Sequence, residues 1–205
     1  MITLGQNKSL VSTLNVTITA LNHSLAGRDD ILVTTSYGFQ SALLFFLMQE
    51  AGVNAEYLYI SSALAQGGIE QHRELINDIF QLEVDVVNRD DWLETQLRGR
   101  DFLDVAPSDR MRICSELKRK PLLEYAQQKK SRIWVTGIRR DQTDKRNSVK
   151  FVNGTDMEMI KIAPIFNWGG EEVDKILKYC NLPVNRMYAD LCKMNASGEC
   201  GLHNL

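Results

Sequence analysis

The sequence predicts an α/β protein with a doubly wound, mostly parallel sheet and helices on both faces. Three short runs rich in apolar and β-branched residues, at 31–34, 55–60 and 133–137, have the length and composition of buried strands. Segments with apolar residues at helical spacing, such as Ile69–Phe80, lie between them. Strands that alternate with helices of this length are typical of βαβ units, in which ligands bind at the carboxyl ends of the strands.

Length and charge narrow the class of protein further. The 205 residues are enough for one well-cored domain, and the 24 basic and 26 acidic residues give a formal net charge of -2. This balance argues against a general nucleic-acid or membrane-surface binder. No apolar run reaches transmembrane length, and the N-terminus lacks a charged start followed by an apolar core. We therefore expect a soluble cytoplasmic protein that binds neither nucleic acid nor membrane.

The first predicted elements are a helix, a strand and a second helix. Ser9–Ala26 carries apolar residues at helical spacing, and Ile31–Thr34 follows as a strand. A small-residue turn, 35–38, then leads into the apolar segment Ser41–Met48, which we interpret as a buried helix. A strand, a glycine-bearing turn and a helix can hold an anion, because backbone N–H groups and the helix N-terminus both attract negative charge. The turn matches neither G-K-[ST] nor GxGxxG, so an ordinary strand–helix corner is the alternative.

The middle of the chain continues the alternation. Glu83–Val87 is predicted to be a strand, and Asp90–Arg100 a polar helix. Asp109–Lys130 is predicted to be a longer helix that Pro121 interrupts. His72 lies in a polar helical context and is expected at the surface. The bases of the long helix predict either a binding surface or a solvated helix face: Arg110, Arg112, Lys118, Arg119 and Lys120.

The strand predicted at Ile133–Gly137 leads directly into a basic loop. Three arginines and a lysine fall within residues 139–146. Arginine offers a planar, permanently charged fork that suits phosphate or sulfate oxygens, so this loop is a second candidate anion site. A solvated charged loop fits the same residues. Met157–Ile165 is then predicted to be a strand, and Gly170–Cys180 a helix that Pro183 ends.

The four cysteines are Cys114, Cys180, Cys192 and Cys200, and they are widely spaced. In a reducing compartment, we expect such cysteines to be free, catalytic or metal-bound rather than disulfide-bonded. Cys200 lies between glycines near the end of the chain, with His203 three residues later. This cysteine could be a nucleophile, because an imidazolium favours the thiolate, or it could be a metal ligand or incidental.

Four motifs together resemble the phosphoadenosine phosphosulfate reductase family, also called the sulfonucleotide reductases. TTSYGFQSALLFFLM is similar to the family's modified phosphate loop, and CSELKRKP to its C-x-x-x-K-x-x-P segment. TGIRRDQTDKR is similar to its G-[LI]-R-R-x-Q-S-x-x-R clamp, and GECGLH to its terminal E-C-G-[LI]-H. The resemblance runs from about Ile31 to Leu205 and implies an adenine nucleotide alpha hydrolase-like fold. We accordingly divide the chain into an α/β nucleotide-binding domain, 1–183, and a C-terminal catalytic tail, 184–205.

The resemblance also implies a reaction and a set of residues. Cys200 would attack the sulfuryl sulfur of 3′-phosphoadenylyl sulfate, and thioredoxin or glutaredoxin would then release sulfite. His203 would tune the thiolate or bind the sulfate, and Glu199 belongs to the same motif without a role that we can derive. The implied substrate-binding residues are Ser36, Tyr37, Gly38, Ser41, Lys118, Gly137, Arg139, Arg140, Gln142 and Arg146.

Departures from the family pattern concern cofactors and substrate. Family members with a 4Fe-4S cluster, chiefly those acting on adenylyl sulfate, carry a C-C pair and a later C-x-x-C. Here Ser115 follows Cys114, and Asn195 stands three positions after Cys192. We therefore expect no tightly bound cofactor and a preference for phosphoadenylyl sulfate. An unorthodox iron–sulfur or zinc site that uses all four cysteines is the alternative.

Other departures leave two further functions open. The family's D-T-G is replaced by residues 59–62, and the segment before ECGLH is shorter than usual, as in a trimmed phage-type member. A PP-loop ATP pyrophosphatase needs S-G-G-x-D-S, whereas here Tyr37 replaces a glycine and Gln40 the aspartate. A nucleotide-binding protein without turnover would have no use for the terminal cysteine. Family analogy also implies a homodimer.

Overall fold

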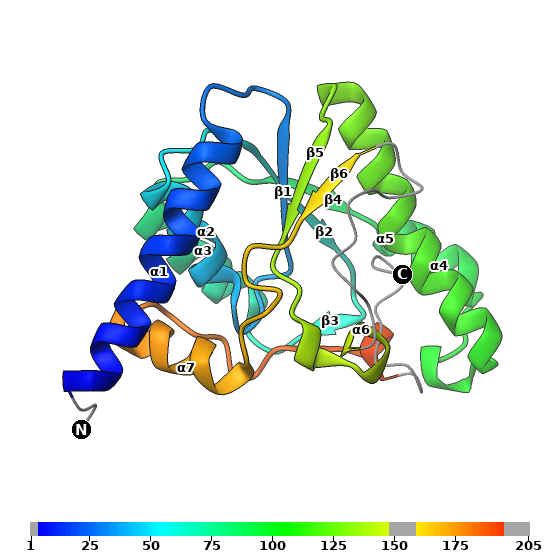
Figure 1. The fold of residues 1–205 in the computed structure, drawn as a ribbon. Coiled ribbons are helices and arrows are strands. Elements are labelled where there is room, and N and C mark those ends of the chain that lie inside the picture. The colour runs from blue at the N-terminus through cyan, green and yellow to red at the C-terminus, as the bar shows by residue number, and fades with distance from the viewer. Residues whose placement is uncertain (1–3, 148–158, 195–205) are drawn as a thin grey trace.

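The protein contains a five-stranded parallel sheet, as seen in a computed structural model that describes residues 4–147 and 159–194. The strand order is β4-β2-β1-β5-β6, and every neighbouring pair is parallel (Figure 1). The strands are β1 (Ile31–Thr35), β2 (Glu56–Ser61), β4 (Asp85–Asn88), β5 (Ile133–Thr136) and β6 (Ile160–Ile162). The chain builds outward from β1 to β4 on one side and from β5 to β6 on the other. The predicted doubly wound α/β class is thus confirmed, and the order reverses between β1 and β5.

Helices cover both faces of the sheet (Figure 1). One face carries α1 (Leu4–Leu25), α2 (Ser41–Glu50), α3 (Ile69–Phe80) and α7 (Gly170–Tyr179). The other carries α4 (Asp90–Leu97) and α5 (Pro107–Lys129). The short elements are η1 (Phe102–Asp104), η2 (Arg140–Gln142), α6 (Asp144–Asn147), η3 (Leu191–Lys193) and the antiparallel pair β3 (Ala65–Gln66) and β7 (Ala189–Asp190).

The central strands are buried on both faces because each face is covered by helices. In β1, Ile31 and Val33 pack toward α1 and α2, whereas Leu32 packs toward α5. In β5, Trp134 lies on the α5 side and donates a buried hydrogen bond of 2.8 Å from Nε1 to Thr34 Oγ1. This bond links the two strands at the reversal in strand order.

The long helix α5 corrects the prediction that Pro121 interrupts it. The helix runs from Pro107 to Lys129 with Pro121 inside. A proline removes one N–H donor from the helix and strains the preceding turn. Leu117 and Leu122, on either side of Pro121, are fully buried, and this packing keeps the helix continuous.

Other element boundaries also differ from the prediction. The strand predicted at Glu83–Val87 starts two residues later, and α4 ends at Leu97 because Arg98 and Gly99 have φ of 53° and 75°. The helix α7 ends before Asn181, whose φ of 51° breaks it ahead of Pro183.

Two predictions concern the last strand and a histidine. The strand predicted at Met157–Ile165 is shorter in the structure: β6 covers Ile160–Ile162, and residues 163–165 are not part of a strand. Positions 157 and 158 lie outside the described residues. His72 is buried, with 8% of its surface exposed, so the expectation that it lies at the surface is wrong. Burial lowers the pKa of its imidazole. No helix within 4–147 and 159–194 is long and apolar enough to cross a membrane.

We expect Phe45 to be a major source of core stability. Its fully buried ring meets Tyr37, Tyr57 and Phe80 edge-on. Phe45→Ala should lower the free energy of unfolding by about 3–5 kcal/mol, measured by urea denaturation. Leu75→Ala, at a 48% exposed position on α3, should change it by no more than about 0.5 kcal/mol. Equal effects of the two substitutions would contradict this packing.

Candidate functional site

A cavity of about 540 Å³ opens at the carboxyl ends of β1, β2 and β5. This is the position that the reversal in strand order favours for a ligand. The volume falls within the range of small-molecule sites. Its lining residues are Thr34, Thr35, Ser36, Gln40, Ser41, Leu44, Leu58, Tyr59, Ile60, Ala65, Lys118, Thr136, Gly137, Ile138, Arg139, Gln142, Arg146, Tyr188, Asp190 and Lys193.

The first wall is the turn between β1 and α2. Tyr37 adopts a left-handed conformation, with φ of 50°, and its N–H donates to Thr35 Oγ1 at 3.1 Å. The turn leads directly into α2, whose first turn has no acidic residue, so the helix N-terminus keeps its attraction for an anion. Ser36 and Ser41 line the cavity at this point.

The Tyr37 side chain points away from the cavity. It is fully buried in the core, where the ring packs edge-on against Tyr59 and the hydroxyl donates to Asn77 Oδ1 at 2.9 Å. Burial raises the pKa of this hydroxyl. Gly38 is also absent from the cavity wall, and a Cβ at this position would lie 3.0 Å from the Tyr188 ring. Gly38 therefore permits a close approach of Tyr188.

The second wall is the basic loop after β5. Arg139 and Arg146 are 9% and 4% exposed, and both line the cavity. Gln142 Oε1 accepts from the Arg139 backbone N at 2.9 Å and from an Arg146 guanidinium nitrogen at 2.5 Å. Asp141 accepts from Arg139 Nε at 2.9 Å. These contacts within the protein orient the two guanidinium groups.

Arg140 points in a different direction from its neighbours. Its guanidinium lies 5.2 Å from the centre of the Phe166 ring, and its backbone N donates to the Phe166 carbonyl at 2.7 Å. It is not among the cavity residues. The adjacent arginines of the loop thus have different surroundings, which their sequence does not distinguish.

Gln40 joins the two walls. Its amide nitrogen donates to the Gly137 carbonyl, and its amide oxygen accepts from the Arg139 guanidinium. Gln142 also donates to this oxygen, at 3.5 Å. Residues nearly a hundred positions apart are thereby connected through one side chain. The sequence distinguishes Gln40 only as the replacement of an aspartate and does not predict this connecting role.

The third wall is a C-terminal segment, residues 187–193, which we call the strap. It pairs with β3 through Ala65 opposite Asp190, and Leu191 N donates to the Leu64 carbonyl at 2.8 Å. Asn185, just before the strap, donates to the Gly67 carbonyl at 2.9 Å. Tyr188, Asp190 and Lys193 of the strap line the cavity. None of these three was predicted, because the segment is short and irregular in pattern.

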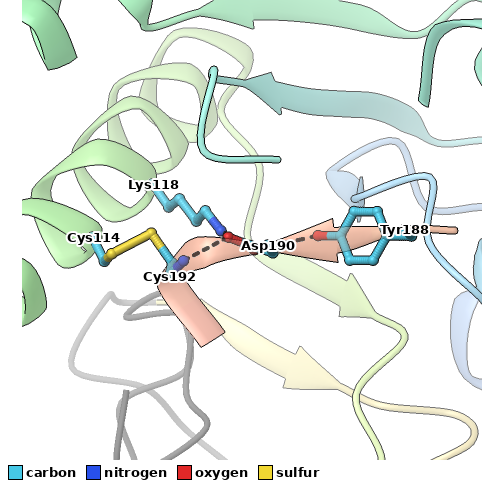
Figure 2. The surroundings of a disulfide bond; sticks show 5 residues. All are labelled: Cys114, Lys118, Tyr188, Asp190 and Cys192. Carbon is cyan, nitrogen blue, oxygen red and sulfur yellow. Dashed lines mark hydrogen bonds and ion pairs between the residues drawn. A yellow bond between two sulfur atoms is a disulfide. The ribbon is translucent and has the colours of Figure 1, made fainter. Parts of the chain in front are cut away.

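A disulfide fastens the strap to α5 (Figure 2). Cys114 and Cys192 are bonded, with their Cα atoms 5.7 Å apart, and both are 1% exposed. For these two cysteines, this corrects the expectation that they are free, catalytic or metal-bound, whereas Cys180 is free as expected. The two are 78 positions apart, so their spacing in the sequence gave no sign of the contact.

A four-cysteine metal site is not supported by the described residues. Cys180 packs against the main core and not in the cluster that holds Cys114 and Cys192, and burial raises the pKa of its thiol. Cys200 lies outside the described residues. Within the described ranges, no three Cys, His, Asp or Glu residues are grouped so that they could hold a metal ion. Cys114 and Cys192 are bonded to each other, so their sulfur atoms are not thiolates and do not fit the ligands of an iron–sulfur or zinc site.

The cavity brings together most of the predicted substrate-binding residues. Cys200, His203 and Glu199 lie outside the described residues. Tyr37, Gly38 and Arg140 do not line the cavity. The predicted residues that line it are Ser36, Ser41, Lys118, Gly137, Arg139, Gln142 and Arg146.

Comparison with known structures supports the α/β fold class. A phosphoadenylyl-sulfate reductase from Candida auris, in a phosphate complex, has a TM-score of 0.67 at 14% identity, covering 90% of each chain. An NMN synthetase from Francisella tularensis has a TM-score of 0.64 at 18% identity, covering 85% of this chain and 71% of that one. At these identities the likeness concerns the fold alone.

Sequence comparison identifies the family. The phosphoadenosine phosphosulfate reductase domain matches residues 30–193. Adenosine 5′-phosphosulfate reductase of Bacillus cytotoxicus is 24% identical over 166 residues, covering 78% of this chain and 68% of its own length. A second such reductase, from Bacillus subtilis, is also 24% identical over 166 residues, covering 78% of this chain and 67% of its own length. The chain belongs to the phosphoadenosine phosphosulfate reductase domain family, as its motifs predicted.

We expect Gly67 to be required for the placement of the strap. Its φ is +91°, and a Cβ there would lie 1.9 Å from the Met187 carbonyl oxygen. Gly67→Ala should lower the free energy of unfolding by about 1–3 kcal/mol more than Gly27→Ala. Gly27 has a similar φ of +72°, but a Cβ there would have nothing within 4 Å, so this position controls for backbone strain. Equal losses in urea denaturation would show that the strap does not need this close approach.

Proposed function

We propose that this protein reduces an adenine sulfonucleotide, with 3′-phosphoadenylyl sulfate as its preferred substrate, to sulfite. The supporting observation is the cavity in which the Ser36–Ser41 turn faces Arg139 and Arg146. The α2 N-terminus and the two oriented guanidinium groups form an environment suited to phosphate and sulfate oxygens. The family membership supports the same class of substrate.

The proposed reaction has two steps. The Cys200 thiolate forms a bond to the sulfuryl sulfur, and the bond from that sulfur to the bridging phosphate oxygen breaks. Adenosine 3′,5′-bisphosphate leaves with the electron pair, and the enzyme carries an S-sulfonate. One thiol of thioredoxin or glutaredoxin then attacks Cys200 Sγ and releases sulfite, and its second thiol resolves the mixed disulfide. The dithiol supplies both electrons.

The oriented arginines serve the first step because the leaving group is an anion. Charge that develops on the bridging oxygen is stabilised most by donors that are already in place. Contacts with Gln142, Asp141 and Gln40 hold Arg139 and Arg146 in place. The enzyme therefore does not have to reorganise these side chains during the reaction.

The proposed catalytic tail begins within reach of the cavity. Lys193, at the end of the strap, lines it, and Cys200 follows seven positions later. Seven residues span at most about 25 Å when extended. A connection of this length is compatible with a thiol that meets a bound sulfonucleotide. We assign His203 to tuning the thiolate or contacting the sulfate.

Two other substrates define the alternatives. Adenylyl sulfate is the second candidate, because the relatives from Bacillus carry the name adenosine 5′-phosphosulfate reductase. An ATP pyrophosphatase is disfavoured by Gln40, which stands where that class has an aspartate. Here the Gln40 amide is engaged with Gly137 and Arg139, and it supplies no carboxylate.

We expect Cys200 to carry the intermediate. Wild-type protein incubated with phosphoadenylyl sulfate, without reductant, should gain the mass of one sulfonate group in intact-protein mass spectrometry. Cys200→Ser should gain none, whereas Cys180→Ser should behave as wild type, since burial raises the pKa of the Cys180 thiol. Reduced thioredoxin should remove the added mass. A parallel incubation with adenylyl sulfate measures the preference, and no gain with either nucleotide would exclude the reductase function.

We also expect the two cavity arginines to bind the nucleotide. Arg139→Ala and Arg146→Ala should each weaken binding of adenosine 3′,5′-bisphosphate about 10- to 100-fold in calorimetry, since a hydrogen bond to a charged group contributes about 1.5–3 kcal/mol. The half-exposed Arg112, on α5, lies outside the cavity, so Arg112→Ala is the control. Arg140→Ala should leave the affinity unchanged, because Arg140 lies against Phe166 and does not line the cavity. A loss as large as that of Arg139→Ala would show that Arg140 also reaches the ligand.

A further inference from the structure

Asp190 is a buried carboxylate in the wall of a cavity suited to anions. Its side chain is 1% exposed. One oxygen accepts from Lys118 Nζ at 2.5 Å and from the Tyr188 hydroxyl at 3.3 Å, and the other accepts from Cys192 N at 3.0 Å. A buried charge is costly unless such partners compensate it. The contact with Lys118 joins the strap to α5, and the other two join Asp190 to its neighbours within the strap.

The disulfide and this ion pair join the same two elements side by side (Figure 2). Cys114 and Lys118 are four residues apart on α5, so they share one helix face. Their partners, Cys192 and Asp190, are two residues apart on the strap. The covalent link therefore restricts the distance over which Asp190 can move away from Lys118.

The remaining attachments of the strap are short. The ladder with β3 contains two residue pairs, and Leu191 N adds one bond to Leu64. Within the part of the chain that the structure describes, the disulfide and the Lys118–Asp190 pair both connect the strap to α5, and Leu191 packs against the apolar cluster that contains Leu117 of α5. Loss of the disulfide should therefore loosen the placement of the three strap residues in the cavity wall, Tyr188, Asp190 and Lys193.

We propose that Asp190 is a positioning residue of the cavity and that the Cys114–Cys192 disulfide holds it against Lys118, so that the redox state of this cysteine pair sets the affinity for nucleotide. Reduction by a dithiol breaks the Sγ–Sγ bond and forms two thiols. The dithiol gives up two electrons and two protons and closes to its own disulfide. The strap then moves more freely, and the cavity binds nucleotide more weakly. The nature of the ligand rests on the proposed function.

The first experiment measures binding in the Cys200→Ser background, which prevents exchange with that thiol. Adenosine 3′,5′-bisphosphate is titrated into protein treated with oxidised glutathione or with dithiothreitol. Reduction should weaken binding about tenfold, equivalent to about 1.4 kcal/mol. A protein with Cys114→Ser and Cys192→Ser should behave as the reduced form under both treatments, and Cys180→Ser should respond as its parent. An unchanged affinity on reduction would overturn the proposal.

Asp190→Asn tests whether the disulfide acts through Asp190. Asparagine keeps the size of the side chain and an oxygen that can accept from Cys192 N, but it removes the charge that pairs with Lys118. Asp190→Asn should weaken binding about tenfold, and reduction should then weaken it no more than about twofold further, because the two changes act on one unit. A disulfide that merely supports the fold would give the same tenfold loss in both proteins, and that result would reject the positioning role.

A second readout does not depend on a nucleotide. Lys118 is 11% exposed at its side chain, whereas Lys120, on the same helix, is 66% exposed. Reduction, and likewise Asp190→Asn, should raise the rate at which an amine-reactive ester modifies Lys118 relative to Lys120, measured by peptide mass spectrometry. If no nucleotide binds to either form, the proposed function fails and this rate alone decides the positioning role. Free Cys114 and Cys192 thiols after treatment with oxidised glutathione would also overturn the proposal.

Discussion

The parallel pairing of β1 with β5 is the constraint on which the site depends. It aligns Leu32 with Trp134 and Thr34 with Thr136, and the buried bond from Trp134 to Thr34 fixes the two strands near their carboxyl ends. Two loops that are about a hundred residues apart therefore leave the sheet at the same edge. The Ser36 turn and the Arg139 loop face each other because the strands that carry them are neighbours. Gln40 adds a direct connection between them.

Local pattern was sufficient to predict the elements that make the fold. The buried strands 31–34 and 133–137 are short and β-branched, and alternation with helices leaves few arrangements other than a parallel sheet. Boundaries were less predictable because they depend on packing. The helix α5 continues past Pro121 where its buried neighbours hold it, and α7 ends before the left-handed Asn181 and Pro183.

The candidate site was predictable where a motif is continuous in the sequence, and not where contacts join distant segments. The sequence predicts Ser36 and Ser41 because they lie in one continuous strand–turn–helix motif. It predicts the arginine loop because its basic residues directly follow a buried strand. It does not predict the inward or outward direction of a side chain within such a stretch, as Tyr37 and Arg140 show. The strap and its disulfide depend on tertiary contacts alone. A two-residue strand is too short to show an alternating pattern in the sequence, and two cysteines 78 positions apart have no spacing that indicates a bond between them.

The same disulfide has a consequence for the unfolded chain. It closes a covalent loop from α5 to the strap, and this loop contains β5, the arginine loop, β6 and α7. In the chain-entropy account, closing a loop of this length raises the free energy of the denatured ensemble by about 4.5 kcal/mol at 25 °C, because the chain loses conformational entropy. The segment that supplies both cavity arginines is thus a closed covalent loop when refolding begins. The segment that supplies the Ser36 turn precedes Cys114 and lies outside this loop.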